Sequence, residues 1–361
     1  MDAQNILRLR NVVKDFGTFR ALHGIELDIK EGEFFTIVGP SGSGKSTLIR
    51  LLVGMEELSE GEIWLRDKRI DQTPANQRPT CMVFQSLALF PHMTVGQNIE
   101  FPLKLRKEAP AARRKRALEL LDLLRLPQNY YDKRISQCSG GERQRVALAR
   151  ALAFDPEILF FDEPLSALDY RLRKTLEKEL KDLHARTGKT FVYITHSLEE
   201  AMVMSDRIAI MKEGRFEQIA VADVIYGSPV SRFVAEFMGE VNLFEVTGTP
   251  RGAPEGPGLE SRLDGKAAGA GLMLAHGEAG TIMVRPEYVR FLPAGQSTDF
   301  MVRGTLVGQY ALGSRIQYEV ETAEGQVLTV EKLREDRFAG AEGAAVVLGF
   351  EAEHAHMIRG A

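Results

Sequence analysis

The chain has 361 residues, 44% of them hydrophobic, which is enough for a sizeable core and for more than one domain. The formal net charge of −4, with 27% charged residues, gives no strongly basic balance, so a nucleic-acid partner is not expected. Two cysteines, Cys81 and Cys138, match no metal or disulfide spacing and favour a reduced intracellular setting, and no run of about 18 apolar residues predicts a membrane span.

The part of the chain up to residue 239 alternates apolar strand candidates with amphipathic helical segments. The expected strands are 34–38, 62–65 (as an edge strand), 80–84, 158–161, 190–195 and 207–211. The expected helices are 46–52, 111–126, 141–154 and 171–186. Buried strands that alternate with helices predict an α/β domain with a mainly parallel sheet over residues 1–239.

The pattern changes near residue 240. Segments rich in Gly, Ala and Pro, such as 248–258 and 267–280, interrupt the chain, and no long helix is evident. Short strand candidates lie at 281–284, 301–306, 315–320 and 326–330. This pattern predicts a small all-β barrel or sandwich over residues 240–361.

A glycine-rich loop follows the first apolar strand and precedes a helix. Its residues are Gly39, Pro40, Ser41, Gly42, Ser43, Gly44, Lys45, Ser46 and Thr47, which fit the pattern G-x-x-x-x-G-K-[ST]. Glycines allow the backbone N–H groups to wrap around phosphate oxygens, and the helix N-terminus adds a positive end. Lys45 would bring positive charge to the outer phosphates, and the Ser46 hydroxyl is placed for Mg²⁺. The loop predicts binding of ATP with Mg²⁺.

Two carboxylates end the 158–161 strand. A carboxylate at the C-terminal end of a parallel strand faces the ligand crevice of such a sheet. We therefore expect Asp162 to hold Mg²⁺, through water, and Glu163 to polarise the water that attacks the triphosphate. Without the glycine-rich loop, a solvated Asp-Glu pair would explain these residues equally well.

A second anion site is indicated where Ser139, Gly140, Gly141 and Glu142 begin a helix. By itself this sequence is explained better as a plain helix cap. A single chain does not need two such sites for one triphosphate. The economical hypothesis is a head-to-tail pair of chains, in which these residues cover ATP held by the other copy.

Six elements occur in a fixed order along the chain. They are the 39–47 loop, Gln85, residues 139–142, Asp162 with Glu163, Ser166-Ala167-Leu168-Asp169, and His196. In this order and spacing they resemble the ATP-binding cassette (ABC) family, from about residue 7 to residue 240. The resemblance implies the P-loop NTPase fold with a helical subdomain, and an ATPase coupled to transmembrane transport.

The resemblance also implies roles for single residues. Phe16 matches the aromatic residue that stacks on adenine, with Phe19 as an open alternative. Gln85 matches the glutamine that touches Mg²⁺ and the attacking water, and its loop connects the site to a membrane partner. Asp169 matches the aspartate that contacts the opposite subunit, and His196 the histidine that reaches the γ-phosphate. With Glu163 and Lys45, Gln85 and His196 complete the expected catalytic set.

The signature sequence departs from the family pattern at both of its ends. Cys138 stands where the family usually has Leu, and Glu142 stands where it usually has Gln. Cys138 is a small hydrophobic residue and should still pack. Glu142 retains size and an oxygen acceptor but adds a charge near a triphosphate, so the substitution concerns the rate of hydrolysis rather than the fold.

The remaining matches point to importers. Val284-Arg285-Pro286-Glu287, followed by Val289 and Phe291, resembles the C-terminal OB-like (TOBE) domain of importer ATPases, and 83–98 resembles their docking loop for a membrane-subunit helix. Segments 165–174 and 237–244 are most similar to the spermidine/putrescine importer ATPases, although iron(III), sulfate, phosphonate and sugar importer ATPases share most features.

Membership of this group implies a particular assembly. Two copies of the chain would pair and energise two transmembrane permease subunits, which receive the solute from an extracytoplasmic solute-binding protein. The chain would then lie on the cytoplasmic face of the cell (inner) membrane. The alternatives from other classes are a non-transport ABC ATPase and a regulatory cassette that no longer hydrolyses ATP.

Overall fold

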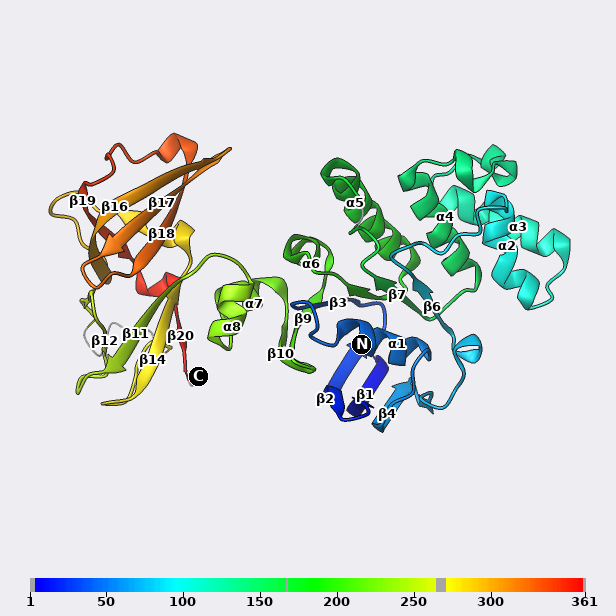
Figure 1. Cartoon of the computed structure of the whole chain (residues 1–361), viewed down its shortest axis with the longest axis horizontal. Helices are drawn as coiled ribbons and strands as arrows, with labels where there is room; N and C mark the ends of the chain where they lie inside the picture. Colours follow the sequence, from blue (N-terminus) through cyan, green and yellow to red (C-terminus); the bar gives the residue numbers. More distant parts are fainter. Residues whose placement is uncertain (1–3, 167, 264–270, 360–361) are drawn as a thin grey trace. The chain divides into compact units, whose positions relative to one another are not determined.

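The computed structural model describes residues 4–166, 168–263 and 271–359. By internal contacts the chain forms two compact units, Met1–Ala222 and Asp223–Ala361. The first unit contains strands and helices in alternation, and the second consists mainly of strands (Figure 1). The predicted fold class, an α/β P-loop NTPase domain followed by an all-β OB-like domain, is confirmed.

The central sheet of the first unit is mainly parallel. Its strands, in spatial order, are β10 (Arg215–Ala220), β9 (Arg207–Lys212), β3 (Phe34–Val38), β8 (Thr190–Ile194), β7 (Ile158–Asp162) and β6 (Thr80–Val83). Only β10 runs antiparallel to its neighbour. The C-terminal ends of the parallel strands therefore meet at one edge. Asp162 ends β7 there, and the 39–47 loop, Gln85 and His196 follow β3, β6 and β8.

A second, antiparallel sheet belongs to the same unit. Its strands, in spatial order, are β2 (Phe19–Lys30), β1 (Asn5–Phe16), β4 (Glu60–Leu65) and β5 (Lys68–Arg69). Between this sheet and the central one lies helix α1 (Lys45–Val53), whose buried Leu48, Ile49 and Leu52 share one apolar core with residues of both sheets. The expectation that 62–65 is an edge strand was wrong, because β1 pairs along one side of β4 and β5 along the other.

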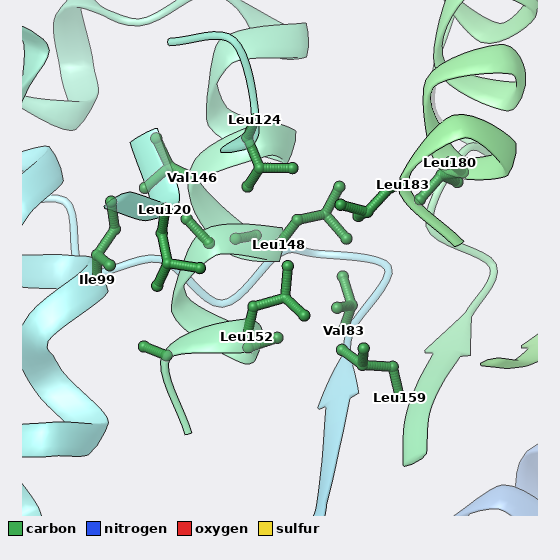
Figure 2. Packing of buried hydrophobic residues seen from close by; sticks show 14 of the residues in the cluster. Val83, Ile99, Leu120, Leu124, Val146, Leu148, Leu152, Leu159, Leu180 and Leu183 are labelled. Atoms are coloured by element: carbon green, nitrogen blue, oxygen red, sulfur yellow. The ribbon is translucent and has the colours of Figure 1, made fainter. Parts of the chain in front are cut away.

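The helical part of the unit contains the signature helix, which begins at residues 139–142, and neighbouring helices pack against it. Its members are α2 (Val95–Leu105), α3 (Pro110–Leu123), α4 (Gly140–Ala153), α5 (Tyr170–Thr187) and α6 (Leu198–Met204). Val146, Leu148 and Leu152 of α4 are buried, and Figure 2 shows Leu148 extending toward Leu183 of α5 while Val146 lies on the side of Leu120 of α3. Val146 and Leu148 are two positions apart and so point to different sides of α4. The helix is therefore buried around much of its circumference, and packing determines the direction in which α4 presents its N-terminus.

The second unit is built from two sheets. One has the order β12 (Pro254–Glu255), β11 (Asn242–Gly248), β14 (Ala279–Val284) and β20 (Ala355–Ile358). The other has the order β15 (Arg290–Phe291), β19 (Ala345–Phe350), β16 (Phe300–Leu312), β17 (Arg315–Thr322) and β18 (Val327–Leu333), with β13 (Leu259–Ser261) paired to β16. Part of the Gly- and Ala-rich segment 267–280 lies outside the described residues.

Two short helices precede these strands, α7 (Ala222–Gly227) and α8 (Arg232–Phe237). Arg285, 2% exposed, donates hydrogen bonds of 3.0–3.3 Å to the backbone carbonyls of Tyr226, Ala235, Gly239 and Glu240. These bonds hold the α7–α8 segment to the strands of its own unit.

The domain boundary at 239/240 remains a prediction. Among the described residues, no helix combines the length and apolar character that crossing a membrane requires.

Candidate active site

The glycine-rich loop has a backbone that other residues would not tolerate. A Cβ atom at Gly39 would lie 2.1 Å from the carbonyl oxygen of Met211. Gly44 has a φ of +103°, and a Cβ atom there would lie 2.9 Å from Leu22. Glycine is therefore required at both positions for the loop to curve tightly before α1 begins at Lys45.

The Lys45 side chain is enclosed by this loop. It is 7% exposed, and its Nζ donates to the carbonyl oxygens of Gly39 and Pro40 at 2.8 and 2.9 Å and to Ser43 Oγ at 3.2 Å. Burial lowers the pKa of the Lys45 ammonium, while the nearby Glu163 and Asp162 carboxylates act in the opposite direction. A buried cation surrounded by polar backbone is suited to a strongly anionic ligand.

A cavity of about 640 Å³ lies against the loop. Its lining residues are Phe19, Ala21, Ser41, Gly42, Ser43, Gly44, Lys45, Ser46, Thr47, Glu163 and His196. Of the two aromatic candidates for adenine stacking, Phe19 lines the cavity, whereas Phe16 is not among its lining residues and has Lys14 Nζ 4.7 Å from its ring centroid. Two larger cavities, of about 720 and 890 Å³, lie away from these residues, so size alone does not select the site.

The two carboxylates at the end of β7 lie in different environments. Burial raises the pKa of Asp162, and the adjacent Glu163 raises it further. Glu163 has a φ of +46°, which is strained for a residue with a side chain, and its N–H donates to the carbonyl of Ile194 at 3.0 Å. Its Oε2 lies 3.2 Å from His196 Nδ1. The structure thus brings Lys45, Ser46, Glu163 and His196 to one cavity.

Gln85 and Asp169 are placed by hydrogen bonds outside that cavity. Gln85 Nε2 donates to Ser166 Oγ at 2.9 Å, and the Ser166 hydroxyl donates to the Glu163 carbonyl at 2.9 Å. Asp169 caps α5, because its Oδ1 accepts a bond from the Leu172 N–H at 3.0 Å. Ala167, which lies between Ser166 and Asp169 in the sequence, is outside the described residues.

The loop after Gln85 is held by an arginine of the signature helix. Leu87 and Ala88 have φ values of +59° and +46°. Arg150 of α4 donates to their carbonyl oxygens at 2.8 and 2.7 Å. The guanidinium therefore stabilises a strained turn at the loop that resembles the importer docking loop. The sequence carried no sign of this contact, because the partners are more than 60 positions apart.

The turn that carries His196 is held by a buried carboxylate, Glu200, which the sequence analysis did not select. The Tyr193 and Thr195 hydroxyls donate to Glu200 Oε2 at 2.8 and 2.7 Å, and Glu200 is 2% exposed. Arg173 of α5 lies 3.9 Å from the other oxygen of Glu200. A buried carboxylate with these partners fixes the turn that presents His196. The available signal was a carboxylate four residues after the histidine.

Residues 139–142 are not among the residues that line the cavity. Ser139 caps α4, with its Oγ accepting a bond from the Glu142 N–H at 3.3 Å, while Glu142 Oε2 accepts one from the Ser139 N–H at 2.7 Å. This reciprocal pair leaves the N-terminus of a 14-residue helix well ordered. Within one chain, the cavity therefore includes the phosphate loop but not the second predicted anion site at residues 139–142.

Comparison with known proteins supports the resemblance to the ATP-binding cassette family that the sequence motifs indicate. The ABC transporter family model matches residues 22–166, and the TOBE domain model matches residues 282–358. The structure is similar to the dimeric ATP-binding cassette MJ0796 in a post-hydrolysis state with ADP and Pi, with a TM-score of 0.53 and 35% identity over 60% of this chain and 98% of that one. It is also similar to the ADP conformation of the cassette MJ1267, with a TM-score of 0.57 and 28% identity over 66% of this chain and 100% of that one.

Curated relatives include two that match over at least nine-tenths of the chain, and so over both units, and one that matches over a shorter part. A spermidine/putrescine import ATP-binding protein of Rubrobacter xylanophilus is 41% identical over 98% of this chain and 94% of its own length. One from Pseudomonas aeruginosa is 43% identical over 91% and 90%, and one from Roseobacter denitrificans 51% over 68% of each. The fold and the site define a nucleotide-binding ABC ATPase. The chain belongs to the ABC transporter family, among the ATP-binding subunits that carry a TOBE domain.

Proposed function

We propose that this chain hydrolyses ATP with Mg²⁺ to energise uptake of a polyamine such as spermidine or putrescine. It would work on two transmembrane permease subunits, at the cytoplasmic face of the cell (inner) membrane, with the solute supplied by an extracytoplasmic solute-binding protein. The observation that carries this proposal is the 41% identity to a spermidine/putrescine import ATP-binding protein, because it spans 98% of the chain and so includes both units.

The phosphate loop would hold the triphosphate. Its N–H groups and the Lys45 ammonium, which now donates to loop carbonyls, are suited to phosphate oxygens. Ser46, Gln85 and Asp162 would hold Mg²⁺, and the raised pKa of Asp162 is consistent with a carboxylate whose charge a cation would offset. Bound Mg²⁺ would supply positive charge to the β- and γ-phosphates.

Glu163 would act as the general base. Its carboxylate accepts a proton from the attacking water, whose oxygen forms a bond to the γ-phosphorus. The bond from that phosphorus to the bridging oxygen breaks, and ADP leaves. His196, 3.2 Å from Glu163, orients the carboxylate and reaches the γ-phosphate. The strained backbone at Glu163, held by the Ile194 carbonyl, fixes the base relative to the loop.

The other half of each site would come from a second copy. Ser139, Gly140, Gly141 and Glu142 would cover the ATP held by the opposite phosphate loop, with Asp169 at the same contact. Their position at the N-terminus of α4, outside the cavity of their own chain, supports this head-to-tail arrangement. ATP would then stabilise the closed pair, and hydrolysis would reopen it, which shifts the permease between two states.

A reconstituted transport assay tests the proposed solute. The chain is purified with its membrane subunits and its solute-binding protein, and ATP turnover in proteoliposomes is measured with spermidine, putrescine, iron(III), sulfate, a phosphonate or a sugar. We expect stimulation by a polyamine alone, and none in a Glu163→Gln complex. Stimulation by another solute class would overturn the polyamine assignment, and turnover indifferent to the membrane subunits would contradict an importer role.

A further inference from the structure

Glu142 is a carboxylate in the segment that, on the proposed function, faces ATP held by a second copy. A bare charge there would oppose the approach of a triphosphate, because like charges repel strongly where water is excluded. The rest of that segment, Ser139, Gly140 and Gly141, is uncharged and suited to an anion. The charge on Glu142 must therefore be offset for the paired site to close.

The structure surrounds this carboxylate with donors. Glu142 Oε1 accepts a hydrogen bond from the Tyr130 hydroxyl at 2.8 Å. Its Oε2 accepts one from the Ser139 N–H at 2.7 Å and one from Lys133 Nζ at 3.2 Å. The Lys133 Nζ also lies 3.8 Å from the centroid of the Tyr130 ring. Both residues come from the segment just before the signature, within and after the short helix η2 (Gln128–Asp132).

Glu142 and Lys133 form an ion pair whose side chains are only partly exposed. The Ser139 N–H first, and the Tyr130 hydroxyl next, lower the pKa of Glu142 to about 2. Desolvation lowers the pKa of Lys133, but the bonds to Glu142 and Tyr130 outweigh it, so that this pKa is raised. The side chains of Lys133 and Glu142 are each 23% exposed, so solvent screens them less than a surface pair. At neutral pH the carboxylate and the ammonium therefore remain ionised, and their charges cancel.

We propose that Lys133 and Tyr130 are positioning residues that neutralise and orient Glu142, so that the signature segment can approach the triphosphate of the opposite copy. Lys133 supplies the compensating charge, and Tyr130 fixes both the ammonium, through its ring, and the carboxylate, through its hydroxyl. The role rests on the proposed paired site and concerns closure of the pair. Binding of ATP to the chain's own phosphate loop does not involve these residues.

A double-mutant cycle tests this role. Lys133→Met exposes the charge of Glu142 and is expected to lower kcat/KM for ATP by about tenfold, as loss of one partner of a charge pair does. Glu142→Gln removes that charge and serves as the second background of the cycle: there Lys133→Met should change kcat/KM by no more than about twofold relative to Glu142→Gln alone. Lys133→Arg retains the charge and should also be near wild type. Lys115→Met, at an exposed position of α3, is the matched control.

Two further measurements separate a charge effect from a loss of structure. The defect of Lys133→Met should shrink at high salt, where repulsion is screened, and ATP affinity of unpaired chains should not change. The proposal is overturned if Glu142→Gln fails to rescue Lys133→Met, or if Lys133→Met behaves as the wild type. Ser139→Arg is measured in parallel. If it loses turnover while rescue fails, only the charge role falls; if it retains turnover, the paired site falls as well.

Discussion

Glu163→Gln is expected to lower ATP turnover by about two to four orders of magnitude, because the variant loses the carboxylate that accepts the proton of the attacking water. The side chain keeps its size, so the cavity beside the phosphate loop should keep its shape and ATP should still bind. Removing this charge also removes one of the two causes that raise the pKa of Asp162. Phosphate release and equilibrium nucleotide binding, measured on the same preparation, check both parts of the expectation.

A matched control for this variant is Glu199→Gln. Glu199 is an exposed carboxylate of α6 that pairs with Lys174 at 2.7 Å, away from the cavity residues. The Glu199→Gln substitution should leave ATP turnover within about twofold of the wild type, since exposed ion pairs contribute little to stability. Turnover of Glu163→Gln close to that of the wild type would contradict the assignment of Glu163 as the base.

Lys45→Ala is expected to weaken ATP binding by about a hundredfold or more. A charge-assisted contact from a buried ammonium to phosphate oxygens is lost, and the remaining N–H groups of the loop cannot replace its charge. Titration with ATP, followed by calorimetry, measures the affinity directly. Thermal unfolding supplies the folding check: the unliganded variant should unfold cooperatively, while ATP should raise the Tm of the wild type much more than that of the variant.

The structural risk in this variant is small but measurable. Lys45 donates to the carbonyls of Gly39 and Pro40, so its loss leaves these groups to water and costs about 1 kcal/mol. If the loss of ATP binding free energy is far greater than this cost of about 1 kcal/mol, the loss comes from missing contacts with ATP rather than from a disturbed loop. An ATP titration curve that coincides with that of the wild type would contradict the phosphate-loop role of Lys45.

The parts of the fold that the sequence predicted well are those with strong local signals. The buried strand β3 was predicted with its observed bounds, Phe34–Val38, because a short, mostly apolar run ends at a glycine-rich loop. β7 and α4 were predicted to within one residue at each end. In each case the signal, an apolar run or a cap followed by a periodic face, lies within about 15 residues.

The elements that sequence reasoning missed have irregular patterns. The long strands β1 and β2 contain register shifts, for example between Leu9 and Val12, and these interrupt the alternation by which a strand is recognised. Helix α2 was missed because Pro102 lies within it and argues against a helix. Its start is nevertheless marked by a capping box between Thr94 and Gln97.

The candidate site shows the same division. The residues of the phosphate loop could be selected from their spacing, whereas the hydrogen bonds between Gln85 and Ser166, and between Arg150 and Leu87, join positions far apart in the chain. No local pattern predicts such pairs. The choice between Phe16 and Phe19 for adenine also depends on which ring reaches the cavity, and the structure places Phe19 along its wall.

The central claim is that one ATP site is built from the phosphate loop of one copy and residues 139–142 of another. The most direct measurement is the mass of the Glu163→Gln chain in solution, with and without ATP, compared with the same chain carrying Ser139→Arg in addition. We predict that ATP converts Glu163→Gln into a dimer with one ATP per chain, whereas the double variant binds ATP equally well and remains a monomer. A Glu163→Gln chain that binds ATP without pairing, or a double variant that pairs as well as its parent, would contradict the account.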